Sequence, residues 1–250
     1  ANTTASNNTA VGLNALRVTT TGAQNVAMGS QAMATNTTGN LNVAVGQDTL
    51  RYNTTGSSNT AVGSDALTAN TTGARLVAVG NASLDANTTG QRSTAVGYAT
   101  LSTNTTGNFN TAVGDIALQF NTTGTHNTAI GLGALEQNTT GSNNTAVGVE
   151  ALDATTTGAD NTAVGKSAGG AITTVINNTL IGKGAGDALD TGNRNTVMGE
   201  AALTSDTKGA RNVAIGNATL SSQNFTSATD SLNTAVGYAA GSSLTNGGIN

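Results

Sequence analysis

The sequence has no Cys, no Pro and no Trp, and it has a single His. Without cysteine, neither a disulfide framework nor a thiolate metal site can form. Nine Lys and Arg against thirteen Asp and Glu give a net charge of −4. Cations this sparse do not form the dense basic stripe that binds nucleic-acid phosphates. We therefore expect no nucleic-acid partner.

Long apolar runs are also missing. No stretch approaches the roughly 18 apolar residues of a membrane-spanning helix, and no charged-then-apolar signal peptide opens the sequence. We expect no membrane insertion in this segment. The sequence begins at Ala1 rather than Met, so we expect a mature form or a fragment whose export signal, anchor or capping domain lies outside it.

Bulky apolar residues are scarce, since only 45 of 250 residues are Leu, Ile, Val or Phe. That share is below the level of about one fifth at which disorder is suspected. Disordered chains usually also carry a large charge imbalance, which is absent here. The composition therefore excludes a wide single-core globule and permits an ordered chain with a very thin core.

A short repeat organises the whole sequence. An Ala-(Val/Met/Ile)-Gly tripeptide or a close variant recurs every 17 residues, with one final step of 21. Its glycines are Gly12, Gly29, Gly46, Gly63, Gly80, Gly97, Gly114, Gly131, Gly148, Gly165, Gly182, Gly199, Gly216 and Gly237. These fourteen copies predict a single array over residues 1–250. We expect irregular coils at about 165–195 and an insertion of four residues at about 220–232.

The unit reads Asn-Thr-Ala-Val-Gly-x-x-Ala-Leu-x-x-Asn-Thr-Thr-Gly-x-x. Seventeen residues are too few for a helical hairpin but suit one coil of a parallel β-solenoid, with coils stacked about 4.8 Å apart. Recurrent glycines mark the turns, and β-branched Thr and Val fill the segments before them. We predict an all-β parallel β-solenoid, or β-roll, of fourteen coils, each with two short strands and two turns.

Stacking would align equivalent residues into rows. The row just before the first Gly, which includes Val62 and is called the valine row, and the row four residues after that Gly, the leucine row with Leu67, are the expected core. Asn59 belongs to a row of Asn in twelve of the fourteen copies, which predicts a ladder of side-chain amides along the axis.

Such a thin core predicts association between copies. One Val and one Leu per coil contribute about 3 to 6 kcal/mol, whereas ordering 17 residues costs roughly 25 kcal/mol. The row that includes Thr60 exchanges Thr for Val at Val26, Val43 and Val77, as expected for a half-buried site. Thr and Val of one strand have the same parity and face one surface, while Asn and Ala face the other. We expect a homo-oligomer.

The segments Asn25-Val-Ala-Met-Gly29 and Asn42-Val-Ala-Val-Gly46 resemble the head repeats of trimeric autotransporter adhesins. The longer unit with Asn-Thr-Thr-Gly is similar to repeat regions of phage and bacterial tail-fibre-type proteins. The resemblance covers essentially the whole chain. It implies a left-handed parallel β-roll and a homotrimer, with Ala61 and its row inside the roll. The trimer interface that it implies consists of Val62, Val79 and Val96 and their row.

No residues form a recognisable catalytic, cofactor-binding or metal-binding pattern. His126 is the only His and stands at a variable position, where an exposed loop residue is a better interpretation than a catalytic base. We therefore expect a non-enzymatic protein without a cofactor. Exposed aromatic residues at variable positions can contact a receptor or glycan. The candidate receptor contacts are Tyr98, Phe109 and Phe120.

Two functions remain open from the sequence. The first is a structural fibre or adhesin segment, outside the cell, at the cell surface or on a virion, which spaces or presents a receptor-binding surface. Its partners would be other copies of itself and a host-cell receptor or glycan. The alternative is an ice-binding, or antifreeze, β-solenoid in which rows of Thr such as Thr60, Thr94 and Thr111 order water. Adjacent Thr pairs such as Thr71 and Thr72 point to opposite sides, which predicts only one exposed Thr row there.

Overall fold

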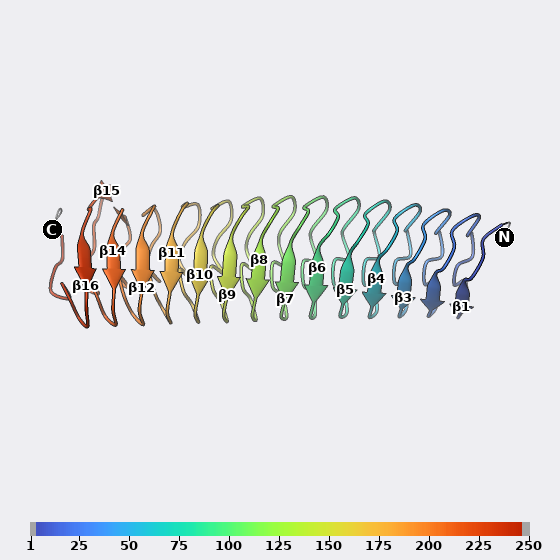
Figure 1. Ribbon diagram of the computed structural model, residues 1–250, viewed down its shortest axis with the longest axis horizontal. Coiled ribbons are helices and arrows are strands. Elements are labelled where there is room, and N and C mark those ends of the chain that lie inside the picture. Colours follow the sequence, from blue (N-terminus) through green and yellow to red (C-terminus); the bar gives the residue numbers. More distant parts are fainter. Residues whose placement is uncertain (1–3, 247–250) are drawn as a thin grey trace. The chain divides into compact units, whose positions relative to one another are not determined.

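The computed structural model describes residues 4–246, and every regular element in that range is a β-strand. The chain divides into two compact units, one ending at Thr125 and the other beginning at His126. Within each unit, parallel strands lie side by side and recur about every 17 residues (Figure 1). The predicted all-β parallel solenoid is therefore confirmed for each unit, whereas a single array over residues 1–250 stays a prediction.

Residues 4–125 of the first unit contain seven strands, each paired in parallel with the next. Thr60 pairs with Val77 and Val77 with Thr94, so every residue faces its equivalent one repeat away. The strands are β1 (Thr9–Val11), β2 (Val26–Met28), β3 (Val43–Val45), β4 (Thr60–Val62), β5 (Val77–Val79), β6 (Thr94–Val96) and β7 (Thr111–Val113).

The second unit repeats this arrangement and adds one short pair of strands. Its main strands are β8 (Thr128–Ile130), β9 (Thr145–Val147), β10 (Thr162–Val164), β11 (Thr179–Ile181), β12 (Thr196–Met198), β14 (Val213–Ile215) and β16 (Thr234–Val236). The pair β13 (Gly209–Ala210) and β15 (Thr229–Asp230) forms a separate parallel ladder beside the insertion. Val213 nevertheless pairs with Thr234, so the four added residues leave the main register intact.

The middle residue of the main strands, which is Ala except for Leu180 in β11 and Val197 in β12, faces the interior, and the valine row does not. Ala61, Ala78 and Ala95 are fully buried, whereas Val62 is 36% exposed on the opposite side of its strand. The prediction that the valine row forms the core is therefore wrong. The predicted leucine row is confirmed, since Leu67 and its equivalents from Met33 to Leu220 are buried, while Leu16 in the first coil is half-buried. In the regular coils, leucine and the amide side chains share this interior with the small methyl group of alanine.

Most coils in residues 4–246 lack the expected second strand, and the short pair β13 and β15 is the exception. The segment after the strand contains residues with left-handed backbone, including Asp65 (φ 61°) and Leu67 (φ 54°), which interrupt the extended conformation of a strand. Its amides still bond between coils: Leu67 N–H donates to the Ser83 carbonyl at 3.0 Å, and Asp65 N–H to Gln47 at 3.0 Å. Coil stacking therefore uses hydrogen bonds on both sides, although only one side is a strand.

Two rows of asparagine occupy the interior, and one of them is the predicted ladder. Asn59 N–H donates to the side-chain oxygen of Asn42 at 3.0 Å, and the equivalent bond recurs along the row. The second row lies in the turn, where Asn70 donates its amide to Asn53 at 2.8 Å. Buried polar groups are costly unless paired. These amides are bonded both between coils and within a coil.

The tetrapeptide Asn-Thr-Thr-Gly has a distinct task for each residue. The carbonyl of Gly73 accepts amide hydrogens from both Asn59 and Asn70, each at 3.0 Å. Thr71 donates its hydroxyl to the Thr88 carbonyl of the next coil at 3.0 Å, and Thr72 is exposed. A side chain on the glycine of this motif would overlap with the amides of the asparagine rows and with the next glycine's carbonyl. These hydrogen bonds and close contacts explain why the same tetrapeptide recurs in successive coils.

The irregular coils at 165–195 have apolar residues in place of the turn asparagines, while the strand asparagines Asn178 and Asn195 stay buried and bonded. Gly169 and Gly186 replace the leucine row, while Ile172 and Leu189 replace the turn asparagines and are fully buried. A Cβ on Gly169 would lie 2.7 Å from Leu180 and 3.0 Å from Ile172, so these larger side chains fill the vacated space. The side chains that fill the interior therefore differ between these coils and their neighbours.

The insertion is anchored by one buried acid. Asp206 stands in the turn asparagine row and accepts hydrogen bonds from the backbone N–H of Gly209 at 2.9 Å and of Phe225 at 3.2 Å. The Gln223 amide also donates to Asp206, at 2.6 Å, and Asn233 donates to Gln223 at 2.8 Å. The carboxylate accepts from its own turn and from the first residues of the insertion, and so joins the two.

Two glycine substitutions in the second unit test how closely the coils stack. Gly148 has φ +136°, and a Cβ there would meet the Gly165 carbonyl carbon and oxygen at 2.6 Å. Gly184 has φ +62° with open space around it. We expect Gly148→Ala to destabilise the unit by more than about 3 kcal/mol, because coil separation must increase. Gly184→Ala, the control, should cost about 1 kcal/mol. Denaturant midpoints measure both, and equal midpoints would contradict this stacking.

Candidate interaction surfaces

The valine row forms a continuous apolar strip on the outer face of the strands. Met28 is 44% exposed and Ile130 is 41% exposed. Together with the outward Thr or Val two residues earlier, these side chains form what we call the outer strip. In the first unit its valine-row members are Val11, Met28, Val45, Val62, Val79, Val96 and Val113, and in the second Ile130, Val147, Val164, Ile181, Met198, Ile215 and Val236. Contiguous exposed apolar surface is typical of interaction sites.

The three residues of the predicted trimer interface lie next to one another. Val62 pairs with Val79, and Val79 with Val96, across three successive strands of the first unit. Val62 is exposed, and the other two are half-buried between their neighbours. The structure therefore brings the three residues into one line on the outer strip.

The two threonines of Asn-Thr-Thr-Gly differ in exposure, as expected. Thr72 is exposed, while Thr71 is half-buried and uses its hydroxyl between coils. The exposed residues of this kind in the first unit form an uninterrupted row: Thr21, Thr38, Thr55, Thr72, Thr89, Thr106 and Thr123. The row on the strand is different, because Val77 stands between Thr60 and Thr94.

The three candidate receptor contacts are exposed but occupy different positions in the coil. Tyr98 follows the strand glycine and is 57% exposed. Phe109 follows the Asn-Thr-Thr-Gly turn, and Phe120 precedes that turn in the next coil. The Arg92 guanidinium lies over the Phe109 ring, with its central carbon 5.4 Å from the ring centroid. The coil register does not align the three aromatic residues in one row.

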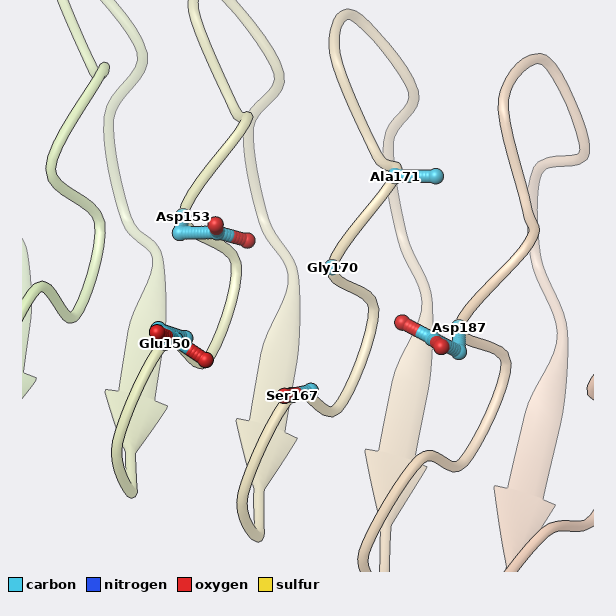
Figure 2. A pocket seen from close by; sticks show the side chains of 6 residues that line it. All are labelled: Glu150, Asp153, Ser167, Gly170, Ala171 and Asp187. Carbon is cyan, nitrogen blue, oxygen red and sulfur yellow. The ribbon is translucent and has the colours of Figure 1, made fainter.

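A shallow acidic hollow lies on the second unit, across three successive coils. Figure 2 shows Glu150 and Asp153 on one coil, Gly170 on the next and Asp187 on the third. The two aspartate side chains reach toward the middle coil. A Cβ on Gly170 would lie 2.7 Å from an Asp187 oxygen and 3.5 Å from an Asp153 oxygen. The absence of a side chain at Gly170 therefore opens the hollow, which the sequence reading did not single out.

Burial changes the acidity of one carboxyl in this hollow. Loss of hydration raises the pKa of Asp153, and the nearby carboxylates of Glu150 and Glu136 raise it further. The same cause raises the pKa of Asp85, at the equivalent position of the first unit. These carboxyls hold their proton more tightly in the folded chain than in the unfolded one.

Neither a metal centre nor a membrane span is found in residues 4–246. No group of three or more His, Cys, Asp or Glu there is arranged to hold a metal ion. The same residues contain no helix of the length and apolarity that crossing a bilayer requires. His126 is exposed. Comparison with protein-family models, with curated proteins and with solved structures finds no match.

The raised pKa of Asp153 predicts a pH-dependent penalty. Because the folded pKa exceeds the unfolded value of about 3.9, the free energy of unfolding falls as pH rises through that interval, and the penalty is complete at neutral pH. Ser102 stands at the equivalent position of another coil, so Asp153→Ser should be compatible with the fold. We expect this substitution to raise the melting temperature at pH 7 and to have no such effect below about pH 3.

Asp160→Asn is the matched control for net charge, because Asn143 and Asn177 occupy its position in neighbouring coils. Thermal denaturation of both variants from pH 3 to pH 8 measures the difference. A stabilisation by Asp153→Ser that is the same at every pH would contradict the assigned cause.

Proposed function

We propose that the chain is a non-enzymatic structural segment of an extracellular, cell-surface or virion fibre, in which copies assemble as a homotrimer and present a receptor-binding surface. The observation that carries this proposal is the outer strip. Each strand directs one Val, Met or Ile away from its own interior, and several of these side chains are 36% or more exposed. A second copy of the same chain offers a strip of identical spacing.

The spacing of the strip favours a copy of the chain over an unrelated partner. Valine-row residues recur at every strand of a unit, about 4.8 Å apart. A partner with the same repeat can match this spacing over many coils, whereas a globular partner would cover only part of it. Association through identical surfaces is common in homo-oligomers. The resemblance to trimeric autotransporter adhesin heads, in which this row faces the trimer axis, supports three copies.

The interior supports a mechanical task. Side-chain amides and backbone groups bond each coil to the next on both sides. Such a stack resists bending more than a chain joined only at its strands. The variable positions remain outside these bonds and are available for recognition, which suits a fibre that presents a surface.

Replacing Val62, Val79 and Val96 together by Asp tests the assembly. We expect a wild-type mass near three times the 24.4 kDa of the chain and a single-chain mass for the variant, because the interface would bury unpaired charges. Since these side chains point outward, the β circular dichroism should remain. Light scattering measures the masses. The control replaces Tyr98, Phe109 and Phe120 by Ser and should stay trimeric. A monomeric wild-type chain would refute the proposal.

Ice binding is a second candidate because one observation favours it. The exposed row with Thr72 is uninterrupted in the first unit and has the regular coil spacing that an ordered water layer would match. Against it, the neighbouring threonines donate their hydroxyls to the next coil. The fibre proposal predicts no thermal hysteresis of freezing. Hysteresis in the wild type that Thr72→Tyr and Thr89→Tyr abolish would replace it with ice binding.

A further inference from the structure

Two arginines and a phenylalanine of the first unit form an exposed line along one edge of the coils. Arg75, Arg92 and Phe109 occupy the same position in three successive coils, and all three are exposed. Their backbone N–H groups make the same bond to the preceding coil, at 3.1, 3.0 and 3.1 Å. Stacking therefore places their Cα atoms about 4.8 Å apart. We call this line the arginine edge.

The arginine edge has no neutralising carboxylate. Within residues 4–246, neither Arg75 nor Arg92 forms an ion pair, although Arg51 pairs with Asp48 at 3.1 Å. The residues next to them at this edge are Thr, Gly, Ser, Ala, Gln and Asn. Two adjacent guanidinium groups repel each other, and an anion placed between them would relieve this repulsion through charge-assisted hydrogen bonds.

The second unit contains a similar arginine pair in which one charge is neutralised. Arg194 and Arg211 occupy this position in two successive coils. There, Arg211 pairs with Asp230 of the insertion at 2.9 Å. The backbone conformation is the same, with φ near 59° at Arg75, Arg194 and Arg211. The two edges differ in the acid partner of Arg211 and in the residue that follows the arginines, which is Leu232 in place of Phe109.

We propose that the arginine edge binds an acidic oligosaccharide. Arg75 and Arg92 would hold a sulfate or carboxylate group between their guanidiniums. The Phe109 ring, which already lies beside Arg92, would support the apolar face of a sugar ring. The exposed Gln91 side chain, on the same coil as Arg92, would donate to a sugar hydroxyl. An acidic oligosaccharide would then be the ligand class of the receptor-binding surface of the proposed fibre. The biological role of the arginine edge rests on that proposed function.

The chemistry favours a glycan over a nucleic acid. Two cations match one or two anionic groups, whereas a nucleic acid presents a phosphate at every nucleotide and needs a longer basic surface. Only one aromatic ring stands at the arginine edge, which is fewer than the stacking platforms of single-strand binders. A neutral sugar would leave both guanidiniums without an anion.

The test variants use residues that the chain already has at this position. Gln24 and Leu41 adopt φ 59° at the equivalent site, so Arg75→Gln, Arg92→Gln and Phe109→Leu should preserve the fold. Calorimetric titration would use a sulfated, a sialylated and a neutral oligosaccharide of equal length. We expect binding of an acidic sugar, weakened about tenfold by each arginine change and several-fold by Phe109→Leu. Preference between the two acidic sugars identifies the anionic group.

Arg194→Gln is the matched control and should leave the affinity unchanged. Failure to bind either acidic sugar, or an equal loss in Arg194→Gln, would overturn the site. Tighter binding of single-stranded DNA, insensitive to Phe109→Leu, would show a general polyanion surface and would also overturn it. Light scattering of the same samples tests the fibre separately, so a trimer without sugar binding refutes only this site, and sugar binding by a monomer refutes only the fibre.

Discussion

In several coils, two asparagine amides donate to one glycine carbonyl, and the remainder of the coil is built around that contact. Gly73 receives the amides of Asn59 and Asn70, and the pattern recurs at Gly39, Gly56, Gly124 and Gly141. These bonds join the strand to the turn within a coil, while the asparagine oxygens join one coil to the next. Removing one amide would leave buried partners unpaired, at about 1 to 3 kcal/mol each. Small residues beside the asparagines are a requirement of this bonding.

Much of the fold could be predicted because the repeat carries its own register. The 17-residue period, the glycine turns and the asparagine ladder all follow from aligned copies of the sequence, and the structure confirms them. The orientation of the strand could not be settled by pattern alone, since Ala61 and Val62 are both apolar and point to opposite faces. Because side-chain amides occupy much of the coil interior, the smaller side chain of Ala61 is buried and the larger one of Val62 points outward. Residue hydrophobicity was therefore a poor guide to which side is buried.

Other features had no signal in the sequence. Leucine is uncommon in left-handed backbone, so nothing indicated that Leu67 would interrupt a second strand. The acidic hollow depends on the side chain that Gly170 lacks, and the arginine edge depends on which charges are neutralised nearby. The variable positions were predicted to lie on the surface. Which of their charges become neighbours depends on how the coils stack. Arg75 and Arg92 are 17 residues apart in the chain and adjacent in the structure.

The insertion in the second unit changes one loop and leaves the stacked strands unchanged. Four extra residues are accommodated next to Arg211 while Val213 still pairs with Thr234. The additional length leaves the stack as a loop held by Asp206, and the following coil resumes in step. One coil corner therefore holds four extra residues without a change in the register of the strands. The solenoid is in this sense a scaffold with a built-in grafting point, whose attached loop can diversify while the repeat stays fixed.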